Sequence, residues 1–107
     1  MNLPEKEGDT VIIAELSIFP TSEGPSVSRF VREAIRVIEA SGLRSVTGGM
    51  STTIEAPDMA ALFRVVQQAH EAVLRQGARR VHIDLHVDHR LDKEATIASK
   101  LGAVGKP

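Results

Sequence analysis

The chain has 107 residues, of which 42% are hydrophobic and 25% charged, and its formal net charge is −1. This length suits one domain with one hydrophobic core, and there is no basic excess for neutralising nucleic-acid phosphates. The absence of cysteine excludes disulfides and thiolate chemistry, and no apolar run is long enough to span a membrane. We therefore expect a cytoplasmic protein with no nucleic-acid or membrane partner.

The first hydrophobic segment begins only after a polar stretch. Residues 1–9 show no periodicity, so we expect a flexible leader before a single domain over residues 10–107. Residues 10–20 are almost continuously β-branched, aliphatic or aromatic, which predicts a buried strand that ends at a proline. Glu15 and Ser17 interrupt this run in the same phase, so both are expected on one face of the sheet.

A loop over residues 21–25 leads into a predicted amphipathic helix. Ser26 is the expected N-cap, and Gly42 is placed for a left-handed C-terminal cap. The spacing of the apolar residues is that of one helix face. These residues are Val27, Phe30, Val31, Ala34, Ile35 and Ile38.

Two short strands and a second helix follow. The strands are expected over residues 43–47 and 50–56, joined by a tight turn at Gly48–Gly49. Asp58 is the expected cap of the helix. Its expected apolar face consists of Met59, Leu62, Phe63, Val66, His70, Val73 and Leu74.

Residues 80–88 alternate between apolar and polar side chains, which predicts a half-buried strand. One face would carry Val81, Ile83, Leu85 and Val87, and the other His82, Asp84, His86 and Asp88. After this strand, Asp92 is the expected cap of a short last helix through Leu101.

The predicted order is β-α-β-β-α-β with an extra C-terminal helix, which matches the ferredoxin-like α+β sandwich. In that arrangement the first strand is central and both main helices cover one face of the sheet. The helices would then cover Ile12, Ala14, Leu16 and Ile18. The opposite face would expose Val11, Ile13 and Phe19 as an apolar patch, so we expect a second subunit to cover it.

Several segments resemble the thiamine-binding protein family. They are Ile13–Pro20 (IAELSIFP), Ser26–Ser28 (SVS), Ala69–Val73 (AHEAV), Gly77–Val81 (GARRV) and Asp88–Lys93 (DHRLDK). The resemblance runs in order from residue 11 to about residue 101. It implies a ferredoxin-like subunit that assembles into dimers and tetramers through its sheets, with ligand sites near subunit contacts. It also implies binding of thiamine or its pyrimidine moiety, with no catalysis and no cofactor.

The resemblance makes the first strand the leading candidate for ligand contact. Glu15 would receive the aminopyrimidine or balance the thiazolium cation, Ser17 would add a hydrogen bond, and Phe19 would offer a ring face. A carboxylate that is desolvated at a subunit contact is a strong hydrogen-bond acceptor. The alternative for Glu15 is a structural salt bridge across the interface, to Arg90 or Arg44.

Three further residues are weaker candidates for ligand contact. Ser26 and Ser28 lie at a predicted helix start, where a ligand phosphate could bind, although Ser26 could simply be the cap. His70 lies on the apolar face of its helix and is either a core histidine or a ligand contact.

The stripe of His82, Asp84, His86 and Asp88 contains the side-chain types that bind metals. Alternate residues of a strand lie about 6.5–7 Å apart, farther than two donor atoms on one metal, so no metal site is predicted. A metal-assisted enzyme that uses this stripe with His70 and Glu15 is one alternative function. A regulatory or assembly module of the same fold is the other. No nucleophile–base set and no phosphate-binding loop is present in the sequence.

Overall fold

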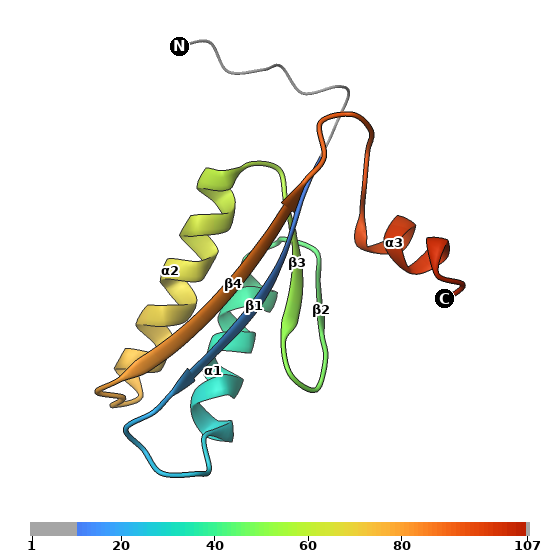
Figure 1. Ribbon diagram of the computed structural model, residues 1–107. Coiled ribbons are helices and arrows are strands. Elements are labelled where there is room, and N and C mark those ends of the chain that lie inside the picture. The colour runs from blue at the N-terminus through green and yellow to red at the C-terminus, as the bar shows by residue number, and fades with distance from the viewer. Residues whose placement is uncertain (1–10, 107) are drawn as a thin grey trace.

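The computed structural model describes residues 11–106, so the expected leader over residues 1–9 lies outside the described part (Figure 1). The elements are β1 (Ile12–Pro20), α1 (Ser28–Ala40), β2 (Ser45–Thr47), β3 (Thr52–Ala56), α2 (Met59–Arg75), β4 (Val81–His89) and α3 (Ile97–Ala103). None of the helices within residues 11–106 is both long and apolar enough to cross a membrane.

The four strands form one antiparallel sheet in the order β2-β3-β1-β4. Both α1 and α2 cover one face of this sheet, whereas α3 stands apart from that helix layer (Figure 1). The ferredoxin-like α+β fold and the central position of β1 are therefore confirmed.

The core forms where β1 meets α1 and α2. Four alternate β1 residues, Ile12, Ala14, Leu16 and Ile18, are buried in it, as their phase predicts. The helices contribute Phe30, Ala34 and Ile38 from α1, and Leu62, Val65, Ala69 and Val73 from α2.

The face of α2 that is buried differs from the prediction. Phe63 and Leu74 are 54% and 44% exposed, whereas Val65, Ala69 and Ala72 are buried. Small side chains let a helix lie close to its neighbours, so the alanines occupy the contact and the larger residues lie outside it. The prediction assigned the bulkiest apolar residues to the buried face. The predicted face is therefore rotated around the axis of α2 relative to the face that is buried in the structure.

The first helix starts later than expected. Its N-cap is Val27, and no side chain caps it, so the assignment of Ser26 as the cap is wrong. The Val27 carbonyl accepts hydrogen bonds from the amides of Phe30 and Val31, at 3.0 and 3.1 Å, which sets the first turn one residue later. At the other end Gly42 has a φ of +84°, as predicted for a left-handed cap.

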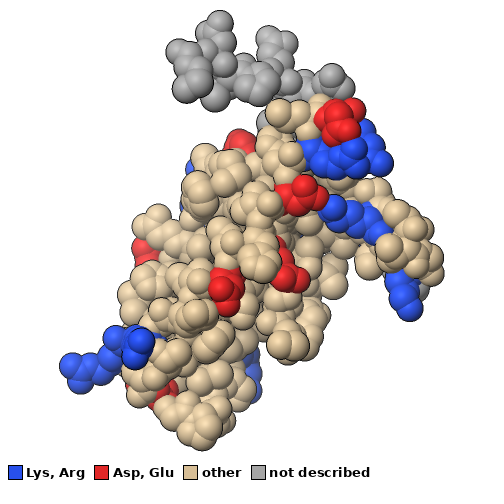
Figure 2. All heavy atoms as spheres, in the orientation of Figure 1, with Lys and Arg blue, Asp and Glu red and all other residues tan. Residues whose placement is uncertain are grey.

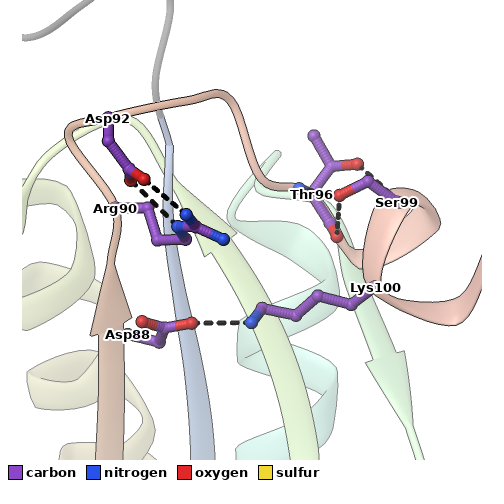
Figure 3. Close-up of polar contacts among 6 residues, drawn as sticks. All are labelled: Asp88, Arg90, Asp92, Thr96, Ser99 and Lys100. Carbon is purple, nitrogen blue, oxygen red and sulfur yellow. Dashed lines mark hydrogen bonds and ion pairs between the residues drawn. The ribbon is translucent and has the colours of Figure 1, made fainter. Parts of the chain in front are cut away.

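The β2–β3 turn and the last helix also differ from the sequence prediction. A loop over residues 48–51 joins the strands instead of a tight turn at Gly48–Gly49, because Thr47 already pairs with Thr52. The cap of α3 is Thr96 rather than Asp92, and Thr96 forms a capping box with Ser99 (Figure 3). Asp92 instead accepts hydrogen bonds from a neighbouring arginine.

The Asp58 cap of α2 is confirmed, since its Oδ1 accepts a hydrogen bond from the Ala61 amide at 2.8 Å. We expect Asp58→Ala to lower the free energy of unfolding by about 1 kcal/mol, because one amide of the first turn loses its partner. Urea unfolding followed by circular dichroism measures this change.

Glu94→Ala is the matched control, since Glu94 is exposed and takes part in no hydrogen bond or ion pair among residues 11–106. A loss of stability in Glu94→Ala as large as that in Asp58→Ala would contradict the observed role of the Asp58 cap.

Candidate functional site

The face of the sheet turned away from α1 and α2 carries the leading candidate residues; we call it the open face. Three cross-strand pairs of β1 and β4 lie along it: Glu15–His86, Ser17–Asp84 and Phe19–His82. Paired residues on antiparallel strands point to the same side, so one alternating phase of each strand builds this surface. The predicted grouping of Glu15, Ser17 and Phe19 on one face is thus found in the structure.

The middle of the open face is acidic. The Glu15 side chain is 54% exposed, and its Oε1 lies 3.8 Å from His86 Nδ1. Asp84 Oδ2 lies 2.9 Å from His82 Nε2. Figure 2 shows acidic side chains across the middle of this face and Lys and Arg side chains toward its ends. Such a surface favours a cationic or hydrogen-bond-donating ligand.

The two arginines considered as partners of Glu15 are engaged elsewhere within the subunit. Arg44 Nε lies 4.0 Å from Glu55 Oε1, and Arg90 pairs with Asp92. The carboxylate of Glu15 therefore has only an imidazole beside it among the ion pairs of residues 11–106.

An aromatic pair lies at one end of the same face. The ring centroids of Phe19 and His82 are 5.1 Å apart and the ring planes are tilted by 34°. Phe19 is half-buried, so part of its ring stays accessible. A flat heterocycle placed there would contact a ring face while its polar atoms reached toward Ser17, the next residue of β1 on this face.

The C-terminal segment covers the other end of the open face. The amide of Ile97 donates a hydrogen bond to Glu55 Oε1 at 2.5 Å, and Glu55 lies opposite Ile13 in the β1–β3 register. Ile97 and Ala95 are 4% and 7% exposed, and Ile13 is only 7% exposed. The expectation that Ile13 would be bare without a second subunit is wrong, because the chain itself covers this end.

One ion pair joins this covering segment to β4, and another lies within the loop that leads to it (Figure 3). Lys100 Nζ of α3 donates to Asp88 Oδ2 at 2.6 Å, and Arg90 donates to Asp92. The hydrogen bond from the Lys100 ammonium is the main cause that lowers the pKa of Asp88. The Arg90 guanidinium likewise lowers the pKa of Asp92, which in turn raises the pKa of Arg90.

The remaining predicted residues do not join this site. Ser26 and Ser28 are exposed at the start of α1, and His70 is half-buried on α2. Both helices cover the opposite face of the sheet (Figure 1). The structure therefore unites three of the six predicted ligand contacts and separates the other three from them.

The stripe on β4 shows no grouping suited to a metal. Within residues 11–106, no three His, Asp or Glu side chains converge as metal ligands. His82 and Asp84 contact each other instead.

Sequence reasoning overlooked a hollow on the helix side of the sheet, between α1 and the β2–β3 hairpin. Its volume is about 180 Å³, and Gly48, Gly49 and Met50 form part of its wall. From the sequence alone, these two glycines are predicted only as a turn. The sequence did carry one signal for the hollow, because the apolar face of α1 is wide. Val27, Val31 and Ile35 extend this face, and in the structure they are only half-buried.

Comparisons with known proteins agree with this architecture. The profile of the family described as thiamine-binding protein matches residues 14–105. UPF0045 protein MJ1052 of Methanocaldococcus jannaschii is 39% identical over 95 residues, which cover 89% of this chain and 93% of the relative. UPF0045 protein YqgV of Bacillus subtilis is 36% identical over 99 residues, covering 88% and 94%.

Two solved structures share the fold. The crystal structure of MJ1052 superposes with a TM-score of 0.83 at 38% identity and covers 91% of this chain and 98% of its own. A putative thiamine biosynthesis/salvage protein from Thermotoga maritima has a TM-score of 0.75 at 20% identity, covering 88% and 98%. At that identity the second likeness concerns the fold alone.

The Asp88–Lys100 contact predicts a specific titration. A carboxyl group with a lowered pKa favours the docked segment above that pKa, and this contribution is lost as the pH falls through it. Carbon-13 NMR of the side-chain carboxyl group should show that Lys100→Gln raises the pKa of Asp88. Lys106→Gln is the matched control and should leave the pKa of Asp88 unchanged. An equal pKa of Asp88 in the native protein and in Lys100→Gln would contradict the contact.

Proposed function

The chain belongs to the thiamine-binding protein family, and from this premise we propose that it binds thiamine or a thiamine-related pyrimidine without transforming it. The observation that carries the proposal is the exposed Glu15 carboxylate on the open face, which also carries the Phe19–His82 ring pair four residues farther along β1. The proposal places this binding in a cytoplasmic homo-oligomer.

The chemistry of this surface matches both halves of thiamine. The exocyclic amine of an aminopyrimidine is a donor that a carboxylate such as Glu15 accepts, and Ser17 can complete the hydrogen bonding of a ring nitrogen. The thiazolium ring carries a fixed positive charge, which the acidic middle of the open face attracts. Phe19 and His82 supply the aromatic contact. No step of this scheme needs a metal or a nucleophile.

Ser26, Ser28 and His70 stand outside the proposed site, because they belong to the helix side of the sheet. Phosphate contact at Ser26 and Ser28, and ligand contact at His70, stay predictions with no geometric link to the open face.

Self-association is supported by the outer strand rather than by the residues first considered. Strand β4 is at the end of the sheet order, so one of its backbone edges pairs with no other strand of residues 11–106. Ile83 and Val87 on this strand are 39% and 42% exposed. A long edge strand with exposed apolar side chains is a template for pairing with another chain. We therefore place a subunit contact along β4.

The role of Glu15 is testable by calorimetric titration of the protein with thiamine, its pyrimidine precursor and thiamine phosphate. Removing the charge with Glu15→Gln should weaken thiamine binding about tenfold or more, since a charge-assisted hydrogen bond contributes about 1.5–3 kcal/mol.

Glu39→Gln, on the exposed side of α1, is the control for loss of one negative charge and should bind as the native protein does. Equal affinity of Glu15→Gln and the native protein would remove the anchor of the proposal. The ranking of the three ligands by affinity would show whether a phosphate contributes to binding.

The subunit contact is testable by sedimentation velocity. The double variant Ile83→Lys/Val87→Lys should sediment as a monomer at concentrations where the native protein forms a larger species, because two charges would have to be buried at the contact. Val46→Lys changes a side chain on β2 that is 46% exposed, and this variant should sediment as the native protein does. A native protein that is monomeric, or a double variant that still assembles, would contradict a contact along β4.

A further inference from the structure

The hollow on the helix side of the sheet, which we call the α1 cleft, is built by three elements. One wall is the apolar stripe of α1, the floor is the second half of β1, and the other wall is the β2–β3 hairpin. Its lining residues from α1 are Val27, Val31, Ala34, Ile35 and Ile38. None of the residues lining it is charged.

The polar groups of the α1 cleft are concentrated on the hairpin. Thr52 lies opposite Leu16 in the register and Thr47 opposite Thr52, so both threonines are on the helix side with the core residue Leu16. Thr52 is only 4% exposed. Its hydroxyl lies 3.4 Å from that of Thr47, which is long for a hydrogen bond between hydroxyls.

Among residues 11–106, the Thr52 hydroxyl has only this long contact, so it lacks the full hydrogen bonding that water would give it. A polar atom delivered by a ligand would supply the missing partner. The apolar surroundings give the remainder of such a ligand a favourable environment, but they provide no counter-charge for an ion.

The size of the cleft limits the ligand further. A dry cavity of about 150 Å³ in another protein holds one benzene molecule. The α1 cleft, at about 180 Å³, therefore accommodates one six-membered ring with a small substituent. At its mouth Met50 is 92% exposed, and a methionine there can fold over a bound ring because its side chain is flexible and polarisable.

We propose that the α1 cleft is a second binding site, which takes one uncharged six-membered aromatic ring whose polar substituent meets the Thr52 hydroxyl. The open face selects for positive charge, whereas this site on the other face of β1 rejects it. The inference goes beyond the proposed function, since it involves neither Glu15 nor the acidic surface, although Ser17 and Phe19 line both sites.

The test compares two probes that share a ring and differ in charge, benzyl alcohol and benzylammonium. Methyl NMR of the full chain reports on the cleft through Met50 and Ile35, which lie at its mouth and on its α1 wall. Benzyl alcohol should shift both signals in a saturable way, and benzylammonium should leave them unchanged at the same concentration.

Variants locate the binding. Val31→Phe should abolish the saturable shift by filling the cleft, with Ile35→Phe as a second blocking variant read at Met50. Thr52→Val keeps the shape but removes the hydroxyl, and it should weaken binding about three- to tenfold. Val66→Phe adds the same volume to a half-buried site on α2 and should bind normally, as should Glu15→Gln.

The proposal is overturned if benzyl alcohol gives no saturable shift at Met50, if benzylammonium binds equally well, or if both blocking variants still bind. Because Glu15 does not line the cleft, Glu15→Gln distinguishes this outcome from the failure of thiamine binding on the open face.

Discussion

The two-residue alternation of β1 is the constraint on which the other features depend. As the central strand, β1 has a hydrogen-bonded neighbour on each side, so its side chains can point only toward the helices or toward the open face. Every second residue from Ile12 to Ile18 is apolar and closes the core. The intervening phase is thereby committed to the opposite side, which brings Glu15 between Thr53 of β3 and His86 of β4.

The open face is asymmetric because, within residues 11–106, the chain covers one end of it and leaves the other accessible. The hydrogen bond from Ile97 to Glu55 and the ion pair of Lys100 with Asp88 bring the C-terminal segment over the end that contains Ile13. Farther along the strand, Glu15 and the Phe19–His82 pair are left partly accessible. A ligand that lay on the whole face would have to displace α3, whereas one bound at the acidic and aromatic end would not.

Sequence reasoning succeeded where the signal was local and chemically unambiguous. The Asp58 cap and the left-handed glycine at Gly42 depend on groups within a few residues, and both are present. It failed where several residues competed for one role. Asp92 is a good cap by type, but Arg90 two residues away engages it, so Thr96 caps α3 instead.

The contact between the C-terminal segment and the sheet had no local signal in the sequence. Ile97 and Glu55 are 42 positions apart, so nothing in either segment indicates that one covers the sheet beside the other. The α1 cleft likewise depends on how far the hairpin stands from α1, which composition does not encode. The three apolar α1 residues left half-buried mark the consequence of that spacing. An apolar helix face that is wider than the core it packs against is therefore a sign of an incompletely filled space. Here that space lies on the helix side of β1, and the acidic open face lies on the other side of the same strand.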